Sequence, residues 1–283
     1  MTKRFDQQYR DICNEILKDG TKVTGRNNLV YYQMFGQTIK VDLRLEFPAL
    51  TLRKLPIKNL YREFMWDVSG ESDVNKLGKA RHFWDFLAHE DGFLPASYGS
   101  SWRNWPVNLE RTASEIEHRV FRFLPFDQLK WIHSELSSNP TNRQLVLTTL
   151  NPAYRLEEMK CPPCHPSVIF SSDGEYLDIL VTARSNDAAV GISLDVFRYS
   201  MLAIKMAQDT GLKPRFVQFS SANNHIYEIN REDIIAIISR EPKLDVPWIE
   251  FNPDKDLFSL DPEIDIELKN YKPHPAVKFD IAK

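Results

Sequence analysis

The sequence predicts an α/β (α+β) fold in which helices flank a mixed β-sheet. Segments with apolar residues at helical spacing alternate along the 283 residues with short apolar runs that are typical of buried strands. Hydrophobic residues make up 42% of the chain, which is enough to form a large core in a protein of this length. The chain contains no internal repeat, low-complexity tract or Gly/Ser linker. We therefore expect a single domain over residues 1–283.

Four segments show the helical period. They run from Phe5 to Leu17, Leu55 to Val68, Gln128 to Ser137 and Val196 to Asp209. The third is expected to end at Asn139, because the residue before a proline is disfavoured in helical conformation. The fourth is expected to end at Gly211, because glycine commonly terminates a helix in the left-handed conformation.

Short apolar runs predict the strands of the sheet. Ser172-Asp173-Gly174 separates two such runs, and Asp-Gly between apolar runs is a strong hairpin signal. A strand pair is expected over Tyr31 to Leu43, interrupted around Gly36. The other predicted strands are Leu145 to Leu150, Val168 to Phe170, Leu177 to Ala183 and Phe216 to Ser221.

Charge and composition argue against several classes of protein. The net charge of -3 and the pI near 6.2 are unlike those of proteins that coat nucleic acid, which usually carry a strongly basic face. The polar N-terminal segment has no apolar signal core, and no later run is long enough to span a bilayer. We therefore expect a cytoplasmic protein with no nucleic-acid or membrane partner.

The three cysteines, Cys13, Cys161 and Cys164, are too few and too unevenly spaced for a disulfide framework, so reduced thiols are expected. Cys161 and Cys164 could form half of a zinc site or a redox pair. A metal site needs two more ligands at suitable spacing, however, and Cys13 is a poor third. We expect no metal site.

Reactive side chains gather in the second half of the chain. Their order is Cys164, His165, Arg184-Ser185-Asn186-Asp187, Gly191, Asp195, His225 and Tyr227. A thiolate can add to an electron-poor carbon that a hydroxyl attacks poorly, and the planar fork of Arg184 suits an anionic substrate. This grouping predicts an enzyme site built around a cysteine nucleophile.

Two of these residues also have simpler interpretations. His165 can be a structural hydrogen-bonding neighbour of the cysteine. Asp195 directly precedes the helix predicted from Val196, where aspartate is a common N-cap.

From Gly20 to the terminal Tyr271-Lys-Pro-His-Pro-Ala-Val-Lys278 segment, the order and spacing of short motifs resemble the thymidylate synthase family. No single motif is specific, but all of them occur in the family's order. They are Arg26, Leu60-Tyr-Arg-Glu63-Phe-Met-Trp66 with Gly70, Phe83-Trp84-Asp85, Tyr98-Gly99 with Trp102-Arg103, Asn139-Pro-Thr-Asn-Arg143, Pro163-Cys164-His165, Arg184-Ser185-Asn186-Asp187, Gly191 and His225-Ile226-Tyr227.

This resemblance implies a homodimer that forms through the sheet and acts on a pyrimidine nucleoside monophosphate. Cys164 would add to C6 of the base and make C5 nucleophilic toward a one-carbon unit from 5,10-methylenetetrahydrofolate. The substrate phosphate would be bound by Arg184, Arg26 and Arg143 of the partner subunit. Where the family usually has a second arginine, this chain has Gln144, so one cationic donor is missing.

The resemblance also assigns the remaining site residues. Glu63 would order water and transfer protons, with Tyr98 and His165 beside it among the catalytic residues. The substrate would contact Ser185, Asn186 and Asp195, and its sugar hydroxyls His225 and Tyr227. The reduced folate would contact Arg53, Phe83, Trp84, Asp187 and Gly191.

Asp195 departs from the family pattern, because thymidylate synthases have an asparagine there that recognises uracil. Cytosine presents an N4 amino donor beside N3. A carboxylate can accept from that donor and favours protonation of N3. Asp195 therefore predicts a cytosine nucleotide. The asparagine in Arg184-Ser185-Asn186-Asp187 likewise resembles the deoxycytidylate hydroxymethylases of this superfamily.

Two further departures concern the end of the reaction, where hydride gives a methyl product and water gives a hydroxymethyl product. Cys161 replaces a leucine that packs the cofactor in the synthases, and Leu87 replaces a bulky indole. Both changes loosen the shield against water, although Trp84, which guards hydride transfer in the family, is present. We expect a deoxycytidylate 5-hydroxymethyltransferase. The alternatives are a dCMP C5-methylase, a uracil-specific synthase or hydroxymethylase, a CMP hydroxymethylase, and an inactive relative that binds nucleotide or RNA.

Overall fold

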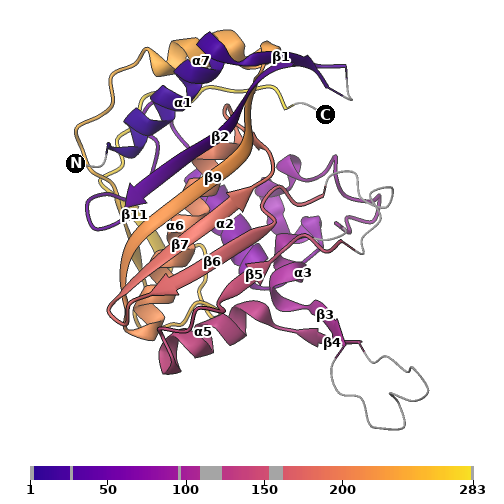
Figure 1. The fold of residues 1–283 in the computed structure, drawn as a ribbon, viewed down its shortest axis with the longest axis vertical. Coiled ribbons are helices and arrows are strands. Elements are labelled where there is room, and N and C mark those ends of the chain that lie inside the picture. The colour runs from indigo at the N-terminus through magenta and orange to yellow at the C-terminus, as the bar shows by residue number, and fades with distance from the viewer. Residues whose placement is uncertain (1–2, 26–27, 95–96, 109–122, 153–161, 282–283) are drawn as a thin grey trace.

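The computed structural model describes residues 3–25, 28–94, 97–108, 123–152 and 162–281. In these residues the main feature is a seven-stranded sheet of order β1-β2-β9-β7-β6-β5, with β8 paired to β9 off this path (Figure 1). Strands β7 and β8 run parallel to β9, and the other neighbours in the sheet are antiparallel. The strands are β1 (Thr21–Thr24), β2 (Val30–Asp42), β5 (Val146–Thr148), β6 (Ser167–Ser172), β7 (Tyr176–Ala183), β8 (Asn186–Asp187) and β9 (Lys213–Tyr227).

Helices flank this sheet, and Figure 1 shows α2 and α6 behind it. The helices are α1 (Phe5–Asp19), α2 (Ile57–Val68), α3 (Tyr98–Arg103), α5 (Gln128–Ser138), α6 (Gly191–Thr210) and α7 (Arg231–Ile238), with 3₁₀ helices η1 (Val74–Phe83) and η3 (Glu228–Asn230). Two small sheets pair β3 (Trp105–Asn108) with β4 (Phe123–Phe126) and β10 (Trp248–Phe251) with β11 (Ile266–Lys269). The predicted mixed sheet with flanking helices is confirmed. No helix in the described ranges is long and apolar enough to cross a membrane.

The core lies between the sheet and the helices behind it. Along β7 the side chains of Leu177, Ile179, Val181 and Ala183 are buried, whereas the alternate ones are half-exposed. This period-2 pattern is that of a strand with one face on a core. The inward residues join the buried apolar face of α6 in one cluster. The helix is therefore held in place against the sheet along its length.

The predicted helices and the hairpin are present, with small shifts at their ends. α5 ends at Ser138, before Asn139-Pro140, and α6 ends at Thr210, capped by Gly211, whose φ of 73° is left-handed. β6 and β7 form the predicted antiparallel hairpin. In its turn the Asp173 carboxylate accepts hydrogen bonds from the backbone of Glu175 and Tyr176.

Two predictions about these elements were wrong. Tyr31 to Leu43 is one continuous strand, because β2 pairs with β9 in unchanged register on both sides of Gly36, whose φ is 76°. Helix α6 begins at Gly191 rather than Val196. Asp195 is therefore in the second turn of the helix and is not its N-cap, so its carboxylate is available to side chains.

Candidate active site

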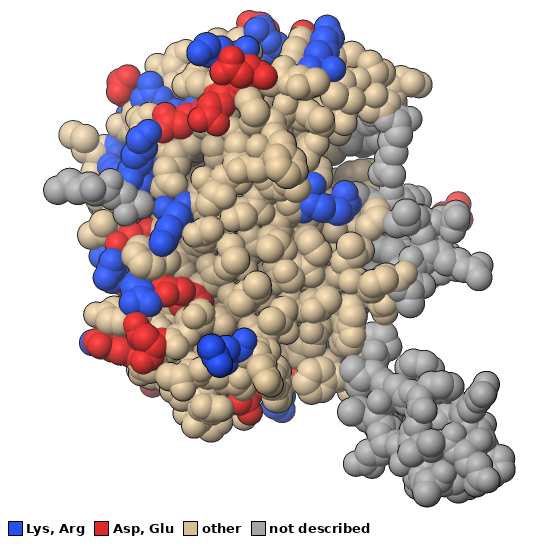
Figure 2. Space-filling model, in the orientation of Figure 1, with Lys and Arg blue, Asp and Glu red and all other residues tan. Residues whose placement is uncertain are grey.

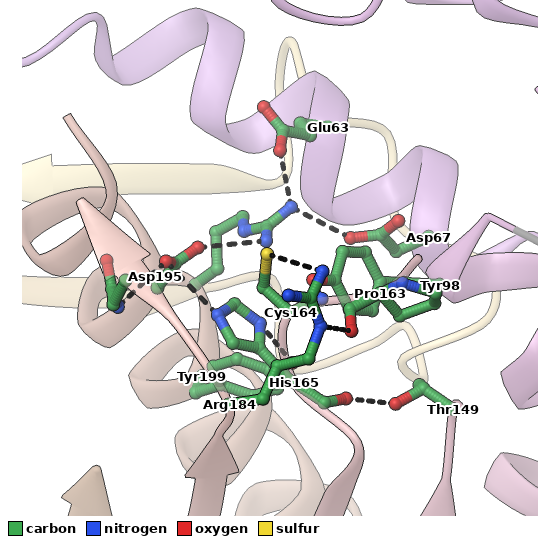
Figure 3. A network of polar contacts seen from close by, with 12 residues as sticks. Glu63, Asp67, Tyr98, Thr149, Pro163, Cys164, His165, Arg184, Asp195 and Tyr199 are labelled. Carbon is green, nitrogen blue, oxygen red and sulfur yellow. Dashed lines mark hydrogen bonds and ion pairs between the residues drawn. The ribbon is translucent and has the colours of Figure 1, made fainter. Parts of the chain in front are cut away.

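Cys164 lies just before β6 and is held by contacts from two other segments (Figure 3). Its backbone N–H donates to the hydroxyl of Tyr98, at the start of α3, over 2.9 Å. Its carbonyl accepts from the backbone N–H of Arg184, which follows β7. The thiol itself is half-exposed. The backbone of the nucleophile candidate is thus fixed while its sulfur can be reached by a substrate.

The side chain of Arg184 lies against the same segment. Its Nη2 is 3.6 Å from the Cys164 sulfur, and its Nε donates to the carbonyl of Pro163 over 3.0 Å. A neighbouring guanidinium favours the thiolate over the thiol. Because Arg184 is an exposed residue, it can also meet an anionic group brought by a substrate.

His165 is buried and connects the cysteine segment to α6. Its Nδ1 is 3.1 Å from the hydroxyl of Tyr199, and its ring stacks on Tyr98 with 5.3 Å between centroids. Its Nε2 lies 3.2 Å from Oδ2 of Asp195. These contacts agree with the simpler interpretation of His165 as a structural neighbour of the nucleophile.

Asp195 accepts contacts on both carboxylate oxygens. Oδ2 faces His165 and Nδ2 of Asn186, the latter at 3.3 Å, while Oδ1 lies 3.2 Å from Nη2 of Arg198. Burial raises the pKa of Asp195, but His165 and then Arg198 outweigh this and hold the pKa below its ordinary value. Asp195 is therefore an anion at neutral pH.

Arg198 joins Asp195 to two carboxylates of α2. Its Nη1 donates to Oε1 of Glu63 and, over 3.0 Å, to Oδ2 of Asp67. Burial raises the pKa of Glu63, and it raises that of Asp67 to about 7 although Arg198 acts in the opposite direction. A proton that binds to this cluster near neutral pH therefore goes to Asp67 on α2 and not to Asp195.

Trp84, directly after η1, lies beside this cluster. Its ring centroid is 6.0 Å from that of Trp66 and 6.4 Å from that of Tyr98. Its buried Nε1 faces the carboxylate of Glu63 and acts to lower the pKa of that group. The neighbouring Phe83 is half-buried and packs on the ring of His82, with 3.9 Å between centroids.

Three predicted folate contacts surround the start of α6. Arg53 is buried and donates through Nη2 to the carbonyl of Ala189 and the hydroxyl of Ser193. Asp187 accepts from the backbone of Ala189, and burial raises its pKa to about 6. A Cβ on Gly191 would lie 2.2 Å from Oδ1 of Asn186, so any other residue here would force Asn186 to shift.

His225 and Tyr227 lie at the end of β9, where their rings meet at 5.1 Å. Burial lowers the pKa of His225 to about 4, so its ring is neutral at pH 7. Its Nδ1 is 3.0 Å from Oδ1 of Asn223. β8 pairs Asp187 with His225, which places the two predicted contact groups side by side. Ser185, just before β8, is half-exposed.

Other predicted residues are not in this group. Arg26 and Cys161 lie outside the described residues, so their predicted contacts are untested. Arg143 and Gln144 are exposed in the segment between α5 and β5. Arg143 does not belong to the polar network of Figure 3.

Our reading of the sequence missed Arg198, Asp67 and Tyr199. A signal for the first two was present, because Asp195 and Arg198 are three residues apart and Glu63 and Asp67 four apart, which places each pair on one helix face. Charged residues at such spacing are equally typical of a solvent-exposed helix face. Burial of these pairs depends on the packing of α2 and α6, which the spacing does not show.

No group of three or more His, Cys, Asp or Glu side chains that could hold a metal ion occurs within the described ranges. The fold and the site together define an α/β protein with a half-exposed cysteine beside a guanidinium and a buried cluster of carboxylates. The chain belongs to the thymidylate synthase family. The sequence model of that family, described as thymidylate synthase, matches residues 7–283. Enzymes of this family transfer one-carbon units to a pyrimidine nucleotide and use methylenetetrahydrofolate as co-substrate.

Proposed function

We propose that this protein transfers the one-carbon unit of 5,10-methylenetetrahydrofolate to C5 of dCMP and completes the reaction with water, giving 5-hydroxymethyl-dCMP. The observation that supports this substrate is the buried anion Asp195, which shares a polar network with His165, the neighbour of Cys164 (Figure 3). An amide at that position would suit uracil, whereas a carboxylate suits the amino-bearing edge of cytosine.

The thiolate of Cys164 adds to C6 of the base and forms a C–S bond, which makes C5 electron-rich. C5 then bonds to the one-carbon unit and loses its proton, and tetrahydrofolate departs, leaving a methylene group on C5. Water adds to this methylene, and the C–S bond breaks to restore the ring and the thiolate. No electrons are transferred to or from the folate, so tetrahydrofolate is released without oxidation.

Asp195 can accept a hydrogen bond from cytosine without giving up its protein contacts. A carboxylate offers about four lone-pair sites; two accept hydrogen bonds from Arg198 and Asn186, and His165 Nε2 lies 3.2 Å from Oδ2. The remaining site can receive the N4 amino group or a protonated N3. A uracil edge would place O4 against the same anion, which leaves buried polar groups unpaired and discriminates strongly.

Glu63 is suited to move the protons of this reaction. It lies mostly buried on α2, and burial raises its pKa, which makes its protonated form easier to reach than that of an exposed glutamate. Arg184, with Arg26 and Arg143 of the partner subunit, would bind the phosphate. The neutral ring of His225, together with Tyr227, would contact the sugar hydroxyls.

The other side of the site fits a reduced folate. Trp84 packs with Trp66 and Tyr98, and an aromatic wall of this kind suits a pterin ring. Asp187 has a pKa near 6, so its carboxyl can donate or accept a hydrogen bond with a heterocycle. Phe83 and Arg53 would add further contacts, and the absence of a side chain at Gly191 leaves room for Asn186.

A hydride finish is the second candidate, and Trp84 is the observation that favours it. In the family this tryptophan guards hydride transfer, and here it is packed against Trp66 and Tyr98. Water is favoured by Leu87, which is half-buried in the small cluster around Trp66 where the synthases have a larger indole. With a hydride finish the product would carry a methyl group, and dihydrofolate would form.

The proposed active unit is a homodimer that forms through the sheet. The face of the sheet seen in Figure 2 carries few charges at its centre, and Lys, Arg, Asp and Glu gather at its margins. A centre depleted of charged residues, surrounded by a charged rim, is the usual composition of a subunit interface. Arg143, which is exposed, would reach the site of the partner subunit.

Product analysis tests this proposal. The protein is incubated with methylenetetrahydrofolate and, separately, dCMP, CMP or dUMP; product mass is measured and dihydrofolate followed by absorbance. We expect a hydroxymethyl product from dCMP and no dihydrofolate. Formation of dihydrofolate would show that hydride, and not water, completes the reaction. A product from CMP alone or from dUMP alone would show that dCMP is not the substrate.

A further inference from the structure

The buried guanidinium of Arg198 has contacts that the proposed reaction does not by itself require. It lies between two helices, each of which presents an ionisable pair on one face: Glu63 and Asp67 from α2, and Asp195 and Arg198 itself from α6. Its side chain is 7% exposed, so these contacts are shielded from solvent.

The three carboxylates are divided between the two terminal nitrogens of Arg198. Nη1 binds Glu63 and Asp67, which are both on α2, and Nη2 binds Asp195 on α6. A guanidinium is planar and rigid, so groups bound to its two ends are held at a fixed separation. The carboxylate proposed for proton transfer and the carboxylate proposed for base recognition are therefore attached to opposite ends of one rigid group.

We infer that Arg198 is a positioning residue that fixes Asp195 relative to Glu63, and that Asp67 is the anchor that holds Arg198 in place. The inference rests on the proposed function, because it assigns Asp195 to the base and Glu63 to the proton. Arg198 acts through these two carboxylates and does not itself touch the substrate.

The charges around Arg198 explain why the anchor matters. One cation faces three carboxylates, so the carboxylates compete for it and for the protons that reach the cluster. Loss of Asp67 leaves Nη1 to Glu63 alone and removes a neighbouring negative charge. Loss of Arg198 leaves all three carboxylates buried without their cation.

Among the described residues, the titratable and charged groups that face this cluster come from α2, α3, α6 and the cysteine segment. They are Glu63 and Asp67 from α2, Tyr98 from α3, Asp195 and Tyr199 from α6, and His165 beyond Asp195.

Three substitutions separate positioning from simple stabilisation. Asp67→Asn keeps the shape and a hydrogen-bond acceptor but removes one charge. Arg198→Met removes the guanidinium at similar length. Arg198→Lys keeps the charge but has one nitrogen, which cannot hold carboxylates on both helices at their present separation. The control is Lys205→Met, which breaks another buried ion pair of α6, with Asp209 at 2.7 Å, two turns further along the helix.

Two readouts are measured for each variant: the ratio of tritium release from C5-labelled dCMP and dUMP, and the pH dependence of kcat with the better nucleotide. We expect Arg198→Met to reduce the cytosine preference by about 10- to 100-fold, the range for one buried hydrogen bond to a charged group. Arg198→Lys should give an intermediate ratio. Asp67→Asn should leave the ratio unchanged and move the limb of the pH profile that reports Glu63 to lower pH, because a neighbouring anion has been removed.

The inference is overturned if the Arg198 variants only lower the melting temperature, as Lys205→Met is expected to do, while base preference and pH profile stay those of the wild type. If Arg198→Met does not fold, Arg198→Lys and Asp67→Asn decide: an unchanged base preference in the first, together with an unmoved pH limb in the second, contradicts the inference. If the wild type used dUMP alone, the proposed substrate would be wrong. The pH limb of Asp67→Asn would still test the electrostatic coupling between Asp67 and Glu63.

Discussion

Cys164 is the residue on which the proposed chemistry depends, and Cys13 provides a matched control. Cys164→Ser should lower tritium release by roughly 10⁴-fold or more, as removal of a nucleophile does in other enzymes with covalent intermediates. Nucleotide binding, measured by calorimetric titration, should persist. Burial raises the pKa of Cys13 to about 12, so its thiol is not a nucleophile at neutral pH. A Cys13→Ala protein that lost turnover as completely as Cys164→Ser would contradict the assignment.

Asp67 should make the stability of the protein depend on pH. Because its pKa is raised from 3.8 to about 7 on folding, its contribution is fully present below pH 3.8 and is lost as the pH rises through 7. Asp67→Asn removes this dependence. Between pH 5 and pH 7.5 the wild type should lose about 2 kcal/mol more unfolding free energy than the variant. Urea denaturation at the two pH values measures this, and equal losses would contradict the assigned shift.

At the scale of single residues, the site could be predicted where side-chain chemistry is unusual in itself. Cys164 beside a proline, and Asp195 where the family has an amide, were both recognisable from residue type and order. Arg198 and Asp67 were not, because a charged pair at helical spacing is the usual pattern of a solvent-exposed face. Their burial results from contacts between helices more than a hundred residues apart in sequence.

At the scale of elements, the start of α6 determines the geometry around Asp195, the proposed base-recognition residue. Asn186, which binds Asp195, can approach α6 closely because residue 191 has no side chain. Gly191→Ala would place a Cβ 2.2 Å from Oδ1 of Asn186. We expect a loss of about 1–3 kcal/mol of unfolding free energy, the usual effect of overpacking, and a loss of cytosine preference.

A double-variant cycle tests this cause. If the clash with Asn186 is responsible, Gly191→Ala should destabilise the protein less when Asn186 is already alanine, and the two effects will not add. Thermal unfolding of the four proteins gives the interaction energy. Simple additivity would show that the added methyl group acts elsewhere.

Elements were predictable where the signal is local. The hairpin β6–β7 follows from Asp173-Gly174, and the ends of α5 and α6 follow from a proline and a glycine. The beginning of α6 was not predictable in this way, because an aspartate before an apolar run is also typical of an N-cap. The short pairs β3–β4 and β10–β11 were missed as well, since each strand has four residues and its partner is well separated in the chain.

At the scale of the whole molecule, the proposed homodimer makes each site depend on both subunits. Arg143→Ala and Cys164→Ser should each be inactive as pure proteins. After the two are mixed and allowed to exchange subunits, the mixed dimer contains one site with Cys164 and the partner's Arg143. Activity should then return to about a quarter of the wild-type value, because half of the dimers are mixed and each has one complete site. If the exchanged mixture recovered no activity, Arg143 would not act across the subunit interface.

The most direct test of the central claim compares tritium release from C5-labelled dCMP and dUMP by the wild type and by Asp195→Asn. We predict that the wild type releases tritium from dCMP and that the amide variant gains release from dUMP while losing dCMP. Release from dUMP but not dCMP by the wild type would contradict recognition of cytosine by Asp195.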